Sequence, residues 1–353
     1  MPKPQAIPPM PMPSPRKARR NVLENNSVST LDIVGFTHKF LATARPLFVM
    51  HRRPDGDTVG SAVALMHIAK ALGKTPFGIC ADPMPERLAF LTEGLAISSE
   101  LPPPPYTAIA IDVATKEQLG DVKELPIRIS FMLDHHEIGV PFADALVLPK
   151  AAAAGEIVYA VAETLVAMGV LAEIPTAAKT ALYAALSSDT GCFRYSNVTP
   201  ATLRCAAALL EGGAVDAADV NHRLFEMKSE KQLRAEAYTI ENTKTSPDGK
   251  IAWVLITDKE RLALGVEEEH LETVIDMVRS RAGVEVALAV REQPSGVLRA
   301  SMRSSGFDVA SVAAVFGGGG HLRAAGCTVE AETPEKAVDR VLAEIERRFT
   351  PNA

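Results

Sequence analysis

Histidine and aspartate residues gather in a few short stretches of this chain, and such side chains are ligands for divalent cations. The densest stretch, His51–Ser61, reads HRRPDGDTVGS and holds carboxylates at Asp55 and Asp57. Carboxylate oxygens favour a hard ion, and the imidazole shifts the preference toward a transition ion such as Mn²⁺. Taken alone, the stretch also fits a plain strand-to-helix turn capped by aspartate.

Three more clusters of this kind lie farther along the chain, and each follows an apolar segment. Taken singly, each has a structural alternative: a cap or turn for a lone aspartate, and an exposed loop for paired histidines. An isolated carboxylate at the end of an apolar helix is unfavourable unless it is paired, and this favours a ligand role for Asp189, the last of these residues. The residues are Asp112, then Asp134, His135 and His136, and finally Asp189.

The elements predicted around these residues are those of a parallel α/β sheet. Apolar runs at 47–50, 106–111 and 127–133 predict buried strands, and the pattern over 58–72 predicts a helix. Alternating strands and helices indicate the α/β class, with a mostly parallel sheet covered by helices on both faces. Ligands of such sheets bind at the carboxyl ends of the strands, and three of the four clusters directly follow a predicted strand.

The second half of the chain changes in character. An Ala-rich helical pattern leads into a smaller α/β unit, which has a strand pattern at 250–257, a hairpin pattern over 284–302 and a closing helix over 334–348. The predicted organisation is a disordered tail at 1–28, a first domain at 29–212, a helical linker at 213–245 and a second domain at 246–349.

Glycine and arginine residues add candidate phosphate contacts. Successive glycines expose backbone N–H groups that form a concave anion site, and a following histidine can hydrogen-bond a phosphate. A flexible linker is the alternative for such a run, disfavoured because strand-like sequence follows at once. In the first domain, Arg194 can clamp a phosphate with its planar guanidinium. The candidates in the second domain are Arg303, Ser304, Gly317, Gly318, Gly319, Gly320 and His321.

Composition limits the partners. A net charge of −6 over 353 residues argues against binding long nucleic acid through the whole surface, but not against a small anion held locally. The four cysteines have no metal-binding or disulfide spacing, which fits a reducing cytoplasm. Without a long apolar run or an apolar signal core, we expect a cytoplasmic protein with no membrane association.

Taken together and in order, these motifs resemble those of the DHH phosphoesterases. The pattern HxxPDGDxxGS from His51, the DHH trio and the DTG that begins at Asp189 match the first domain of that family. The pattern GGGGHxxAAG from Gly317 is similar to the DHH-associated domain of oligoribonucleases, RecJ-type exonucleases and cyclic-dinucleotide phosphodiesterases. The size and layout are most similar to bifunctional oligoribonucleases and pAp phosphatases (nano-RNases), since the extra domain of RecJ-type enzymes and the transmembrane segments of membrane phosphodiesterases have no counterpart here.

The resemblance implies a centre with two divalent ions, usually Mn²⁺, and a homodimer. It also implies that residues of the second domain bind the part of a short RNA or small nucleotide that lies across a cleft from the metals. In the roles it implies, His51, Asp55 and Asp112 hold one ion, Asp57, Asp112, His135 and Asp189 hold the other, and His136 and Arg194 are catalytic residues on the scissile phosphate.

We therefore expect an enzyme that degrades oligoribonucleotides of roughly two to five nucleotides to nucleoside monophosphates, because a closed pocket limits length. Dephosphorylation of pAp is an expected second activity. One alternative is a soluble phosphodiesterase for cyclic-di-AMP or pApA. Another, of a different class, is a catalytically silent nucleotide-binding sensor, disfavoured because all six implied ligands are present.

Overall fold

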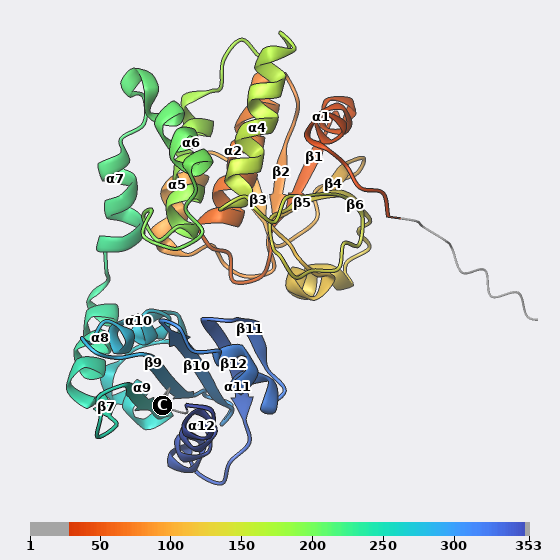
Figure 1. Ribbon diagram of the computed structural model, residues 1–353. Helices are drawn as coiled ribbons and strands as arrows, with labels where there is room; N and C mark the ends of the chain where they lie inside the picture. The colour runs from red at the N-terminus through yellow and green to blue at the C-terminus, as the bar shows by residue number, and fades with distance from the viewer. Residues whose placement is uncertain (1–27, 350–353) are drawn as a thin grey trace, which may run out of the picture. The chain divides into compact units, whose positions relative to one another are not determined.

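The computed structural model describes residues 28–349 of the chain (Figure 1). The tail predicted as disordered lies outside these residues, apart from Val28. The chain divides into two compact units at Leu224 and Phe225. This division falls inside the segment 213–245 that the sequence predicts as a helical linker, and helix α8 (Glu230–Asn242) packs into the second unit.

The first unit is built on a six-stranded sheet in which every neighbouring pair is parallel. This confirms the α/β class and the parallel sheet. The short outer strands β3 and β6 are not evident in the sequence. In the order β3-β2-β1-β4-β5-β6, the strands are β1 (Pro46–Val49), β2 (Phe77–Ile79), β3 (Ile97–Ser98), β4 (Thr107–Ile111), β5 (Ile129–Asp134) and β6 (Asp144–Val147).

Helices flank this sheet, and the most buried is α2, which packs along α5. A helix that is apolar on nearly all sides must be enclosed, and α2 is enclosed because Gly60 lets α5 approach closely. The helices are α1 (Ile33–Ala42), α2 (Gly56–Ala71), α3 (Ala89–Thr92), α4 (Ala154–Ala167), α5 (Thr176–Asp189), α6 (Pro200–Leu210) and α7 (Ala217–Asn221), with 3-10 segments η1 (Glu86–Leu88), η2 (Lys116–Glu124) and η3 (Glu211–Gly213) and the π-helical η4 (His222–Glu226).

The strand order reverses between β1 and β4, and ligands of doubly wound sheets bind at such a switch point. His51 follows β1 and Asp112 follows β4, so both lie at this point. The hydroxyl of Thr58 donates a hydrogen bond of 2.9 Å to the carbonyl of Ile111, which ties the start of α2 to the end of β4. The fold therefore brings the first two clusters to one edge of the sheet.

The second unit contains a six-stranded mixed sheet in the order β11-β12-β10-β9-β8-β7. One face packs against α11 and α12, and the β8–β9 part of the other face packs against α8 and α10. The predicted hairpin (β9 and β10) and closing helix (α12) are confirmed. The strands are β7 (Lys244–Thr245), β8 (Ile251–Ile256), β9 (Val286–Glu292), β10 (Leu298–Ser304), β11 (Gly319–His321) and β12 (Ala324–Val329), and the helices besides α8 are α9 (Asp258–Leu264), α10 (Val274–Arg279), α11 (Val309–Val315), α12 (Pro334–Arg348) and the 3-10 segment η5 (Glu268–Leu271).

No helix within residues 28–349 is long and apolar enough to cross a membrane.

Candidate metal centre

The turn after β1 places His51 and Asp55 side by side. Asp55 Oδ1 accepts hydrogen bonds from the backbone N–H groups of Asp57 (3.0 Å) and Thr58 (3.1 Å), so Asp55 is the N-cap of α2. His51 Nδ1 donates to the carbonyl of Arg52 (2.9 Å), which leaves Nε2 3.6 Å from Asp55 Oδ1. The capping role that the sequence left open is real, and the same carboxylate also faces an imidazole.

Asp57 is fully buried, and its carboxylate lies at the start of another helix. It accepts hydrogen bonds from the N–H groups of Ala154 (2.6 Å) and Gly155 (2.9 Å) and from the Ser61 hydroxyl (3.0 Å). The N-cap residue of α4 is Ala153, which offers no side-chain acceptor, so Asp57 caps that helix from a distance. The positive end of the helix dipole favours a carboxylate there.

His135 is held in the same manner as His51. Its Nδ1 lies 3.2 Å from the carbonyl of Ala151, and its Nε2 lies 3.6 Å from Asp57 Oδ2, 3.5 Å from Asp112 Oδ1 and 3.2 Å from Asp189 Oδ2. A backbone carbonyl that fixes Nδ1–H and directs Nε2 at carboxylates is the usual arrangement behind metal-binding histidines.

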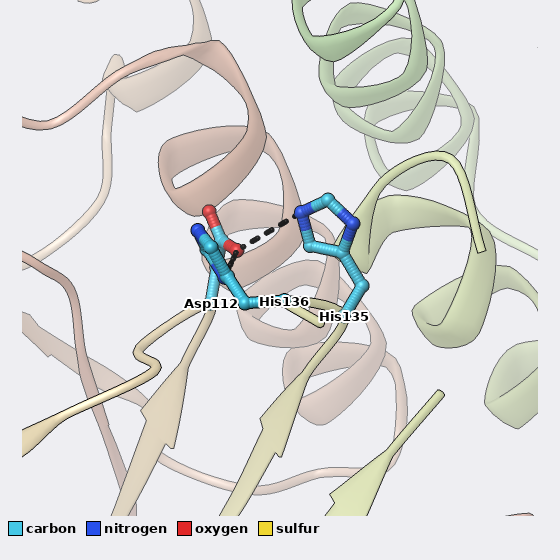
Figure 2. Close-up of side chains that lie close together, drawn as sticks. All are labelled: Asp112, His135 and His136. Atoms are coloured by element: carbon cyan, nitrogen blue, oxygen red, sulfur yellow. Dashed lines mark ion pairs between the residues drawn. The ribbon is translucent and has the colours of Figure 1, made fainter. Parts of the chain in front are cut away.

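Asp112 lies at the centre of these residues (Figure 2). Its backbone has a φ of +59°, a strained conformation for a residue other than glycine, and such strain is concentrated at functional sites. Its Oδ1 lies 3.5 Å from His135 Nε2 and 3.6 Å from His136 Nδ1. This oxygen is buried, yet within residues 28–349 it accepts no hydrogen bond. An unpaired buried carboxylate oxygen is unfavourable, and a cation would satisfy it.

The donor atoms form three overlapping groups, in each of which one atom per residue lies within 4.8 Å of the others. Asp112 belongs to two of the groups. Carboxylate and imidazole donors suit a small divalent ion such as Mn²⁺, so the residues present fit a metal centre. The groups are His51, Asp55 and Asp112; Asp57, His135 and Asp189; and Asp112, His135 and His136.

Charge crowding shifts the protonation of these side chains. Burial lowers the pKa of His51, but Asp112 and Asp55 more than offset this and raise it to about 11. Burial also lowers the pKa of His135, but Asp189 and the other carboxylates around the ring outweigh this effect and raise the pKa of His135 to about 10. Burial and the neighbouring carboxylates raise the pKa of Asp57, and burial raises that of Asp189 to about 6. The cluster therefore attracts positive charge, which protons or metal ions can supply.

His136 belongs to the third of these groups and is also held by a carboxylate outside them, whereas Arg194 belongs to none of the groups. Asp134, buried at the end of β5, accepts a 2.7 Å hydrogen bond from His136 Nδ1 and, against the effect of burial, raises the pKa of that imidazole. No role for Asp134 was predicted from the sequence, although its position directly after the predicted strand 127–133 was a usable signal. Arg194 is exposed, and its Nε donates to the carbonyl of Gly191 (2.6 Å) in the turn that follows Asp189.

In the second unit, the glycine run is folded into a turn and the edge strand β11, so the linker alternative is wrong. A Cβ on Gly318 would lie 2.2 Å from the carbonyl oxygen of Gly326, and Gly317 has a φ of +70°. Arg303 is half-buried, and Ser304 is buried with its hydroxyl donating to the carbonyl of Phe307. Gly319 and Gly320 are exposed, and the side chain of His321 lies outside the described part of the structure.

Comparisons with known proteins agree with this arrangement. Residues 47–186 match the DHH family N-terminal domain, and residues 252–350 match the DHHA1 domain. The chain is 31% identical to the bifunctional oligoribonuclease and PAP phosphatase of Thermus thermophilus over 88% of this chain and 92% of that protein. A protein of the same name from Mycoplasma genitalium is 27% identical over 86% and 93%.

One solved structure with a similar fold is an exopolyphosphatase-related protein from Bacteroides fragilis. It has a TM-score of 0.78 and 22% identity, and the match covers 89% of this chain and 95% of that one. The domain matches and the relatives confirm the predicted resemblance. The chain therefore belongs to the DHH family and is a phosphoesterase with a DHH domain followed by a DHHA1 domain.

Proposed function

We propose that this phosphoesterase is a Mn²⁺-dependent hydrolase that degrades oligoribonucleotides of roughly two to five nucleotides to nucleoside monophosphates and also dephosphorylates pAp. The observation that supports it most directly is the convergence of six carboxylate and imidazole residues around the buried Asp112. The names of the relatives support the choice of substrates, since they combine oligoribonuclease and PAP phosphatase activity.

In this proposal two ions share Asp112. Two divalent cations at such a centre would polarise a phosphoryl oxygen and lower the pKa of an attacking water toward neutrality. The ligands proposed are His51, Asp55 and Asp112 for one ion, and Asp57, Asp112, His135 and Asp189 for the other.

The remaining chemistry belongs to side chains that can donate to the phosphate. Asp134 holds His136 at Nδ1 and raises its pKa, so the ring can stay protonated and donate from Nε2 to a phosphoryl oxygen. The Nε of Arg194 donates to the Gly191 carbonyl, which orients the guanidinium of this exposed side chain, and its terminal N–H groups could then contact a phosphate. Both groups would offset negative charge that develops at the phosphorus.

The second unit would bind the part of the nucleotide away from the scissile bond. Arg303, Ser304, the run Gly317–Gly320 and His321 are the residues proposed for this. Family resemblance supports a homodimer as well, which light scattering of the purified protein would test. Long nucleic acid and membranes are not proposed partners, in keeping with a net charge of −6.

The direct test is a substrate panel with the purified protein and added Mn²⁺. We expect rapid turnover of di- to pentanucleotides, turnover of pAp, and little turnover of a long single strand. Equal rates on the long strand would refute the length limit. Preference for cyclic-di-AMP or pApA would favour the phosphodiesterase alternative, and binding without turnover would favour a sensor.

A further inference from the structure

One face of the second sheet carries a pattern that the proposed function does not use. Along β10 the side chains alternate: Leu298, Ala300 and Met302 are at most 6% exposed and face α11 and α12. Arg299 and Ser301 alternate with them and are half-buried, as is Arg303. Alternate residues of a strand share a face, so these three lie on the side of β10 away from α11 and α12.

The strand register arranges this face in three parallel rows. Because residues paired across strands point the same way, each row crosses the sheet from β12 to β9. We name the rows after one member. The Arg303 row is Ala324, Arg303 and Ala287, the Gly326 row is Gly326, Ser301 and Ala289, and the Arg299 row is Thr328, Arg299 and Arg291.

The middle row is bare. Its members are glycine, serine and alanine, and Gly319 of β11 pairs with Gly326 and continues it. Ala289 is fully buried in the core formed with α8 and α10, but Ser301 and Gly326 are half-buried and Gly319 is exposed. These small residues leave the part of the surface over β10, β12 and β11 accessible between the two arginine rows. Two residues of strand advance the chain by about 6.7 Å, so the Arg299 row lies about 13 Å along β10 from the Arg303 row.

The face also has the charge to hold a polyanion. The strands β10, β11 and β12 contain no acidic residue. Within residues 28–349 no carboxylate forms an ion pair with Arg299. The charged groups nearest to it in the sheet come from β9, where Arg291 lies 3.8 Å from Glu268 of η5.

We propose that the Arg299 row binds a second phosphate of substrates longer than a dinucleotide. This rests on the proposed function, which puts the near part of the substrate at the Arg303 row. An oligonucleotide that lies over the bare Gly326 row brings its next phosphate to Arg299. The guanidinium of Arg299 can make a bidentate contact with that phosphate, and the Thr328 hydroxyl lies beside it in the same row. The Arg299 row thus increases the affinity for longer substrates and takes no part in the chemistry of hydrolysis.

The experiment compares wild type with Arg299→Ala, Arg299→Lys and the control Arg347→Ala. Arg347 is an exposed arginine of α12 that pairs with Glu344, remote in sequence from the three rows. Initial rates are measured on pAp and on di-, tri-, tetra- and pentanucleotides across a range of salt concentrations.

We expect Arg299→Ala to raise KM about tenfold for trinucleotides and longer substrates, as for loss of one charge-assisted contact, and less than twofold for dinucleotides and pAp. The slope of log KM against log salt falls by about 0.7 for the longer substrates only, because one phosphate contact is lost. Arg299→Lys recovers part of the loss, and Arg347→Ala behaves as wild type.

An equal effect on every substrate length, or no effect, would overturn the phosphate contact while leaving the proposed function intact. If wild type turns over none of these substrates, the proposed function fails instead. Equilibrium binding of labelled di- and trinucleotides in EDTA then tests Arg299 separately, and equal affinities of wild type and Arg299→Ala for the trinucleotide would refute the proposal.

Discussion

The two units position their candidate residues in opposite ways. In the first, acidic and imidazole side chains converge at the carboxyl ends of parallel strands, are largely buried, and are held from behind by backbone groups. In the second, polar side chains stand on an open sheet face and beside a glycine turn, where register alone sets their spacing. Burial fixes geometry for chemistry, whereas an open face adapts to substrates of different length.

The largest expected effect is on the shared carboxylate. Asp112→Asn should lower kcat on the order of 10³-fold, because it removes charge from the centre of the cluster. The melting temperature in EDTA should change little, because Asp112 Oδ1 accepts no hydrogen bond within residues 28–349. The lost attraction between Asp112 and His51 is offset by relief of the repulsion between Asp112 and the carboxylates of Asp57 and Asp189. Steady-state kinetics and thermal unfolding measure the two quantities. The control is Asp121→Asn in the exposed part of η2, and comparable activity of the two variants would contradict the central position of Asp112.

A glycine pair tests the difference in packing. Gly60→Ala places a Cβ 2.4 Å from the Ala181 carbonyl oxygen, so the free energy of unfolding should fall by about 1–3 kcal/mol. The Cβ that Gly319→Ala adds has no heavy atom within 4 Å, so this substitution should change the free energy of unfolding by less than about 0.5 kcal/mol. Chemical denaturation followed by circular dichroism measures both. Equal destabilisation would show that the two units are packed with similar tolerance.

A smaller effect is expected in the pH dependence of the metal-free protein. The folded-state pKa values of His51 (about 11) and His135 (about 10) lie above 6.5, so their contribution to stability is full below pH 6.5 and is lost as pH rises toward 10–11. In EDTA the melting temperature should therefore fall between pH 6.5 and 9. His51→Gln should flatten this decline, and the exposed His38→Gln should not. A melting temperature that rises over this range would contradict the assignment.

The sequence predicted the first unit well because its ligands follow apolar strand patterns, and parallel strands end at a common edge. His51, Asp112 and His135 could be grouped on that ground alone. The contact between Asp57 and the start of α4 could not, since it joins residues 97 and 98 positions apart and Ala153 gives no capping signal. The short strands β3 and β6 were missed for a similar reason: neither carries a long enough apolar pattern of its own.

In the second unit the hairpin and closing helix were predictable, but the three rows were not. Their order depends on how β10 pairs with β9 and β12, and a shift of one residue would move Arg299 to the other face. The glycine run was correctly taken as an ordered feature. Its close contact with β12, through Gly318 and Gly326, requires the folded sheet.

The central claim is that one buried carboxylate joins two groups of ligands. Equilibrium dialysis against Mn²⁺, with metal measured by mass spectrometry, tests it most directly. The account predicts two ions per chain for wild type and a marked loss of binding at both sites for Asp112→Asn, because both proposed ligand sets include that residue. A single ion in wild type, or two ions retained at unchanged affinity in Asp112→Asn, would contradict it.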